Sequence, residues 1–166
     1  MELELPMEVI TSRWYENSIA VERGPLVYGL EMEEEWVKKE FPDEERARYD
    51  SYYYEVNSPT KWNWGILNFR GEDIKDHFRV MVDPEKQQEK YFWNRENAPI
   101  RITVKAKEIK SWGLYNEMAG PLPFSVNQSN APEEEITLIP YGCTTLRICL
   151  FHPKSIPVFQ SKSIPF

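Results

Sequence analysis

The sequence is poor in the residues that carry most catalytic and metal chemistry. Its 166 residues include only two histidines and two cysteines: His77, His152, Cys143 and Cys149. It contains no Cys-x-x-Cys pair, His-Glu-x-x-His motif or glycine-rich phosphate loop. The cysteines are six positions apart, about 20 Å in an extended segment, so we expect no disulfide between them. Pairing of Cys149 with His152 is a weak alternative, and we predict no catalytic residue, metal ligand or cofactor.

Positive charge and long apolar runs are also scarce. Lys and Arg number 20 against 27 Asp and Glu, which gives a net charge of −7. This balance argues against nucleic acid, whose phosphates need a basic surface, and against an anionic membrane. No run of about 18 apolar residues could span a bilayer, and the acidic N-terminus has no signal-peptide core. We expect a soluble domain of unassigned location, with neutral ligands such as sugars still open.

Short segments typical of β-strands are abundant. The most regular spans 100–107, where apolar and polar residues alternate. Side chains of a strand point to alternate faces, so one set should face a core and the other water. The inward set is Ile100, Ile102, Val104 and Ala106, and the outward set is Arg101, Thr103, Lys105 and Lys107. Further strands are expected near 3–9, 19–21, 26–30, 52–56, 78–82, 136–139 and 145–151. The pattern predicts an all-β fold, an antiparallel sandwich or jelly roll.

One acidic segment, residues 31–49, interrupts the strands. Trp36, Val37 and Phe41 could form a narrow helical stripe that ends at Pro42. We interpret the segment as a short helical or irregular insertion with a solvated charged face. The sandwich domain is expected over residues 1–153. Residues 154–166, which repeat Lys-Ser-Ile-Pro, should form a tail or edge strand because proline is excluded from central strands.

The segment Lys61-Trp62-Asn63-Trp64-Gly65 supplies the candidate sugar-binding residues. If it is extended, Trp62 and Trp64 share a face that could stack on sugar rings, and Asn63 could bind hydroxyls. The alternative, which we favour, is that the tryptophans fill the core or contact a neighbouring domain, since tryptophan is highly buried on average. A glycosidase needs two carboxylates across a cleft, but the acids here lie in runs typical of solvated faces.

Three sequence segments, taken in their order along the chain, carry a resemblance to a known protein family. They are 19–31, which contains Arg-Gly-Pro-Leu-Val-Tyr; 62–67, Trp-Asn-Trp-Gly-Ile-Leu; and 109–147, which contains Leu-Ile-Pro-Tyr-Gly. In this order they resemble the C-terminal β-sandwich region of the β-L-arabinofuranosidase-like glycoside hydrolases, glycoside hydrolase family 127. The resemblance covers most of the chain, from about Leu3 to Phe151.

The resemblance implies a non-catalytic role. Members of that family join an (α/α) barrel to β-sandwich domains, and the nucleophilic cysteine and zinc ligands belong to the barrel. Nothing in this sequence matches the barrel, so no site residue is carried over. The implied function is an accessory domain, inactive in isolation, that packs on a catalytic barrel in cis or in trans. The alternative is a carbohydrate-binding module that holds a plant-type oligosaccharide on Trp62, Asn63 and Trp64. A free-standing enzyme with dispersed carboxylates ranks third.

Overall fold

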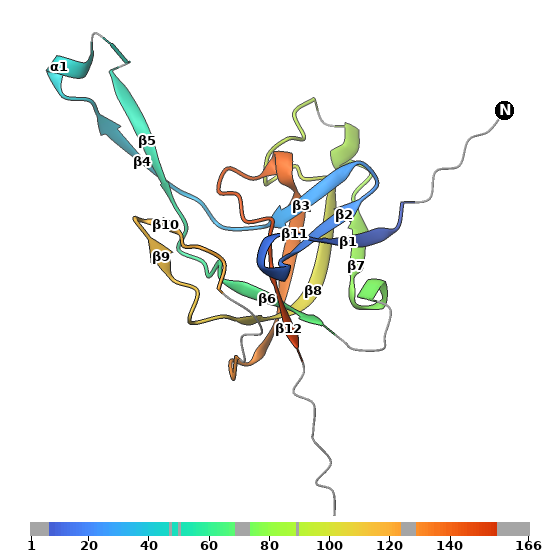
Figure 1. Ribbon diagram of the computed structural model, residues 1–166. Coiled ribbons are helices and arrows are strands. Elements are labelled where there is room, and N and C mark those ends of the chain that lie inside the picture. Colours follow the sequence, from blue (N-terminus) through green and yellow to red (C-terminus); the bar gives the residue numbers. More distant parts are fainter. Residues whose placement is uncertain are drawn as a thin grey trace, which may run out of the picture.

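The main body of the protein is one mainly antiparallel β-sheet (Figure 1). The computed structural model describes residues 7–46, 48–49, 51–68, 74–88, 90–123 and 129–155. The eight strands of the main sheet are β1 (Val9–Arg13), β2 (Ile19–Arg23), β3 (Leu26–Leu30), β6 (Trp64–Asn68), β7 (Arg79–Val82), β8 (Ile100–Glu108), β11 (Glu133–Pro140) and β12 (His152–Ser155). Their order is β1-β2-β3-β11-β8-β6-β12, with β7 also beside β8. Only the β12–β6 pair is parallel among the described strands, so the predicted all-β, antiparallel class is confirmed.

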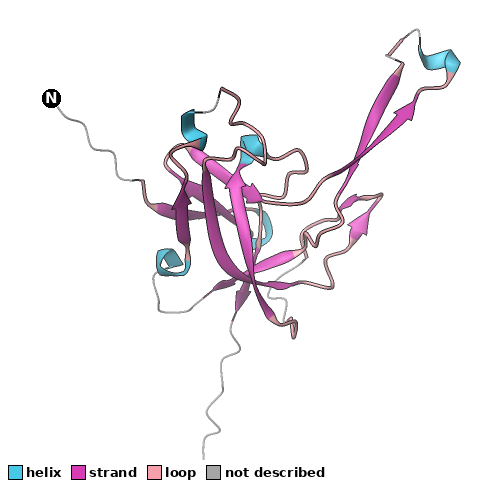
Figure 2. Cartoon of the chain, turned by 180° about the vertical axis from the view of Figure 1, so that it is seen from behind, coloured by secondary structure: helices cyan, strands magenta, loops and turns pink. Residues whose placement is uncertain are grey.

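The main sheet curls until its last strand returns to its first ones (Figure 2). Phe151 and Ile19 exchange two backbone hydrogen bonds, with N···O distances of 2.6 and 2.9 Å. The carbonyl of Ile148 accepts a hydrogen bond from the amide of Leu30 at 2.8 Å. The opposite walls of one curled sheet therefore take the place of the two layers of a sandwich.

The strand expected over residues 145–151 is not formed, and this prediction was wrong. Residues 147–150 lack regular pairing, and Phe151 makes a single bridge. The segment divides its backbone hydrogen bonds between β3 and β2, so no ladder of successive pairs can form. Leu146 and Ile148 are still partly buried and pack against the core.

β8 is the central strand of the sheet. β11 pairs along one edge, while β6 and β7 share the other, opposite residues 106–108 and 100–103 respectively. The predicted inward residues Ile102, Val104 and Ala106 are at most 2% exposed and form the core with side chains of the neighbouring strands. The alternation in the sequence therefore identified both the strand and its buried face.

The other face of β8 is not uniformly solvated, which corrects the prediction. Thr103 is only 6% exposed, and Arg101 is half-buried. Arg101 forms an ion pair with Glu31, Nη2 to Oε1 3.0 Å, and also donates to the carbonyls of Arg95 and Ala98. The loop before β8 thus covers this end of the strand. Only farther along, at Lys105, is the side chain exposed as expected.

The predicted insertion is a two-stranded arm that projects from the main sheet (Figure 2). It consists of β4 (Glu35–Glu40), the short helix α1 (Asp43–Arg46) and β5 (Tyr52–Asn57). A short helix was expected in this region and is present. The helical stripe of Trp36, Val37 and Phe41 was wrong, because Trp36 and Val37 are consecutive residues of β4 and point to opposite faces. The strand expected at 52–56 is confirmed, but it belongs to the arm.

Several small elements complete the described chain. They are η1 (Tyr15–Asn17), η2 (Ile74–His77), η3 (Lys86–Gln88), η4 (Tyr141–Cys143), β9 (Leu114–Tyr115) and β10 (Met118–Ala119). Both cysteines are free, as expected. Among the described residues, no helix has the length and apolar character needed to cross a membrane. Leu3, Leu5 and residues 156–166 lie outside the described residues, and the domain boundary at 153 stays a prediction.

Candidate functional site

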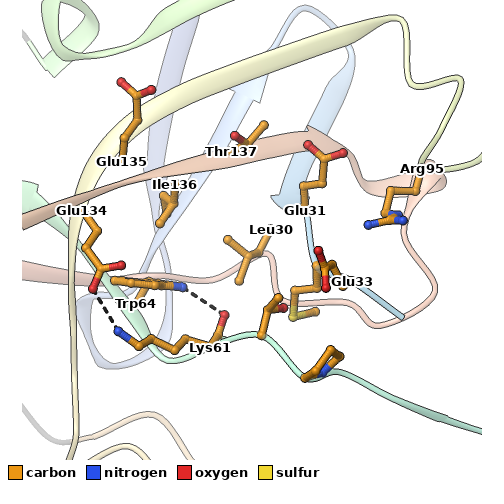
Figure 3. A pocket seen from close by; sticks show the side chains of 13 residues that line it. Leu30, Glu31, Glu33, Lys61, Trp64, Arg95, Glu134, Glu135, Ile136 and Thr137 are labelled. Atoms are coloured by element: carbon orange, nitrogen blue, oxygen red, sulfur yellow. Dashed lines mark hydrogen bonds and ion pairs between the residues drawn. The ribbon is translucent and has the colours of Figure 1, made fainter. Parts of the chain in front are cut away.

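A polar groove of about 580 Å³ lies where the arm joins the main sheet (Figure 3). Its walls come from the chain leaving β3, the chain returning from the arm, and β11. Glu31 and Glu33 lie on the first of these segments, Lys61 on the second and Glu134 on the third, with Arg95 at one end. The groove therefore brings together charged side chains from distant parts of the sequence.

Two charged groups of the groove, Lys61 and Glu31, have partners on strands of the main sheet. Lys61 Nζ lies 2.9 Å from Glu134 Oε1 and 3.3 Å from Glu108 Oε2. The hydrogen bond with Glu134 is the main cause that raises the pKa of Lys61. Glu31 forms the two-point contact with Arg101, at 3.0 and 3.2 Å. These ion pairs connect both ends of the arm to the main sheet, which is a structural role.

The two predicted stacking tryptophans do not share an open face. Trp64 is 5% exposed, lies in the core, and donates from Nε1 to the carbonyl of Lys61 at 3.1 Å. Trp62 is half-buried, with its ring edge-on to Trp112 at a centroid distance of 5.0 Å. Both rings therefore make packing contacts, as the favoured interpretation of the sequence expected.

Asn63 connects two segments of the backbone. Its side-chain amide donates to the carbonyls of Ile109, at 2.9 Å, and Trp112, at 3.1 Å. Its own carbonyl accepts from the amide of Ile109 at 2.7 Å. Sugar binding by Trp62, Asn63 and Trp64 stays a prediction, and their contacts are those of structural residues.

The cysteine thiols lie in surroundings that disfavour thiolate. Burial raises the pKa of Cys143 and of Cys149 above the ordinary range, and buried protonated thiols are typically unreactive. Cys143 Sγ donates to the carbonyl of Phe92 at 3.4 Å. The side chain of His152 lies outside the described residues, so its pairing with Cys149 stays a prediction. In the part of the chain that the structure describes, no group of three His, Cys, Asp or Glu side chains could hold a metal ion.

A second hollow, of about 250 Å³, has two exposed tryptophans in its walls and was not found from the sequence. Trp36 of β4 is 52% exposed, and Trp93, in the loop before β8, is 53% exposed. Glu34, Asn94 and Glu96 also line it. The two tryptophans are far apart in the sequence and share no motif, so only the fold reveals that they belong together. We call this the Trp36–Trp93 hollow.

The curled sheet and the projecting arm define an all-β domain. The chain belongs to glycoside hydrolase family 127, since the model of the family's C-terminal domain matches residues 12–147. The resemblance seen in the sequence is thus confirmed. The match identifies an accessory domain of a glycoside hydrolase, associated with a catalytic domain of the same protein. No curated protein and no solved structure matches the chain.

Proposed function

We propose that this domain has no catalytic role of its own and packs on the catalytic helical barrel of a family 127 hydrolase through the outer part of its arm. The observation that carries the proposal is a set of aromatic side chains on both faces of the arm, which we call the outer aromatic cluster. Its members are Phe41, Tyr49, Tyr52, Tyr53 and Tyr54. The four tyrosines are between 38% and 52% exposed.

The rings of the outer aromatic cluster form two packed groups, because Tyr53 points to the opposite face of β5 from Tyr52 and Tyr54. Phe41 contacts Tyr53 and Tyr49, with ring centroids 4.7 and 5.4 Å apart, and Tyr52 contacts Tyr54 at 5.7 Å. A two-stranded hairpin is marginally stable on its own. Tyrosine is enriched at protein interfaces, where its ring is buried and its hydroxyl finds a hydrogen-bond partner. A protein surface against the face with Tyr52 and Tyr54 would therefore both stabilise the arm and gain binding energy from it.

The charge of the arm indicates what kind of surface it would contact. Residues 33–57 contain nine acidic and four basic side chains, a net charge of −5 out of −7 for the whole chain. Complementary potentials favour association, and like charges oppose it. We therefore expect the arm to contact a basic region of the catalytic domain that also offers apolar side chains.

Isothermal titration calorimetry with the catalytic domain of the same hydrolase tests this proposal. The double variant Tyr52→Ser, Tyr54→Ser should raise the dissociation constant about 10- to 100-fold, the range expected for two interfacial aromatic residues. Tyr15→Ser is the matched control, because Tyr15 is 70% exposed but lies outside the arm. Equal affinities for the wild-type chain and the double variant, or no association at all, would contradict the proposal.

A further inference from the structure

We propose that the Trp36–Trp93 hollow binds a neutral oligosaccharide. This site differs from the Trp62–Trp64 segment, and it adjoins the outer aromatic cluster through the contact between Trp36 and Tyr54. The proposal rests on two fixed, exposed indole rings, on polar groups between them that can still bind hydroxyls, and on the charge of the hollow.

Each indole is held in place by specific contacts while it stays more than half exposed. Trp36 Nε1 donates to Glu34 Oε2 at 3.1 Å, and its ring lies edge-on to Tyr54 at 5.8 Å. The ring of Trp93 packs on Phe92, with centroids 4.8 Å apart. Large apolar rings that are exposed yet fixed lose little conformational entropy when a ligand covers them. The C–H face of a sugar ring is apolar and can pack against such a ring.

Gly142 in η4 allows Trp93 to adopt this position. A Cβ atom at residue 142 would lie 2.9 Å from Trp93 Cε3 and 3.2 Å from Cζ3, too close for an unstrained contact. The backbone does not itself require glycine here, because among the described glycines only Gly24 has a positive φ. The close approach of the indole is therefore the structural reason for glycine at this position, and it gives the site a residue that can be altered without removing a binding group.

The polar lining suits hydroxyl groups, which both donate and accept hydrogen bonds. Glu34 Oε1 accepts from the backbone amide of Thr145 at 3.0 Å, and each of its oxygens retains further acceptor capacity. Arg95 Nε lies 3.6 Å from Glu96 Oε1, so the hollow offers donors beside acceptors. Carboxylates and a guanidinium interleaved with aromatic faces resemble the mixed lining of small-ligand sites.

The charge of the hollow selects among sugars. Two carboxylates, from Glu34 and Glu96, are balanced by only one guanidinium, from Arg95. An acidic sugar would bring a third carboxylate into this surface and would be repelled. We therefore expect neutral oligosaccharides to bind and uronic acid oligomers to bind much more weakly.

The experiment titrates the 166-residue chain with neutral arabino- and xylo-oligosaccharides and, separately, with oligogalacturonate. Tryptophan emission and calorimetry report binding. We expect a saturable change with a neutral sugar and a dissociation constant about 30-fold higher in Trp93→Ala, the loss typical of a central aromatic contact. Trp14→Ala is the matched control, because Trp14 is 61% exposed and does not line the hollow, and it should bind as tightly as the wild type.

A second variant separates a binding defect from a folding defect. Gly142→Ala should displace the Trp93 ring and weaken binding about tenfold, with the circular dichroism spectrum of the wild type. If Trp93→Ala does not fold, the sugar affinity of Gly142→Ala tests the proposal instead. The proposal is overturned if no neutral sugar produces a saturable change in tryptophan emission at concentrations up to about 10 mM. A dissociation constant above about 10 mM would be too weak for a formed binding site. The proposal is also overturned if both variants bind as tightly as the wild type, or if oligogalacturonate binds better than the neutral sugars.

Discussion

Arg101 is the residue whose replacement tests the structural account in most detail. Its guanidinium makes the two-point contact with Glu31, at 3.0 and 3.2 Å, and donates to the carbonyls of Ala98, at 3.0 Å, and Arg95, at 2.9 Å. Glu31 lies where the chain leaves β3 for the arm, and residues 95–98 precede β8. One side chain thus connects the start of the arm to the loop that carries Trp93.

The magnitude of the effect of Arg101→Met follows from these contacts. A hydrogen bond to a charged group contributes about 1.5–3 kcal/mol net, and one to a carbonyl about 0.5–1.5 kcal/mol. The side chains of Arg101 and Glu31 are 24% and 21% exposed, so solvent screens the pair and the lower part of the range applies. We expect the free energy of unfolding to fall by about 3 kcal/mol. In a domain of this size that corresponds to roughly 6–12 °C in Tm.

Urea unfolding followed by circular dichroism measures this loss. Lys105→Met is the matched control, because Lys105 lies on the same face of β8 but is exposed. An exposed position without such contacts should change the free energy of unfolding by no more than about 0.5 kcal/mol. If the two variants were equally stable, Arg101 would not hold the loop and the arm together, and the reasoning would be refuted.

Three further predictions concern buried and half-buried side chains that stabilise the curled sheet. Asn63→Ala removes both amide donors and should lower the free energy of unfolding by about 2 kcal/mol, while the sugar affinity measured by tryptophan emission stays unchanged. A selective loss of affinity would instead support Asn63 as a binding residue. Phe151→Ala removes a fully buried ring beside its bridge to Ile19 and should cost about 3–5 kcal/mol in urea unfolding; a cost below about 1 kcal/mol would show that this contact does not close the sheet. Burial raises the pKa of Tyr28, partly offset by Arg23, and that of Cys143. The folded state therefore keeps these protons at pH values where the unfolded state loses them, so stability is full below about pH 8.5 and falls as the pH rises beyond the ordinary thiol and phenol pKa values. Unfolding at pH 7.5 and 10.5 checks the sign, and higher stability at the alkaline pH would be contrary to expectation.

Local patterns in the sequence were sufficient where a strand has one buried face. The alternation over 100–107 located β8, and Gly24-Pro25 separated β2 from β3, with Gly24 in the left-handed region at φ 58°. The partner of Arg101 could not be predicted in this way, because Glu31 is 70 positions away in the sequence. A charged residue that alternates with apolar residues in a strand is predicted to face water, and only knowledge of a long-range partner corrects that prediction.

The strand β4 of the arm and the Trp36–Trp93 hollow were missed for a related reason. Trp36 and Val37 are compatible with a helix or a strand, and their pairing with β5 settles the choice only in the fold. Trp62 and Trp64 drew attention because they are close in the sequence, whereas Trp36 and Trp93 meet at one hollow without any shared motif. Proximity along the chain identified the pair in which Trp64 is buried and Trp62 half-buried, and only the structure identified the exposed pair.

The central claim is that this domain acts by supporting a catalytic domain and not by hydrolysing glycosides itself. The most direct measurement follows the hydrolysis of a nitrophenyl arabinofuranoside by the catalytic domain alone, by this chain alone, and by both together after increasing times at elevated temperature. We predict no turnover by the chain alone above a heat-denatured control, and a longer half-life of the catalytic domain when the chain is present. Turnover by the chain alone that disappears with a single substitution, or an unchanged half-life, would contradict the account.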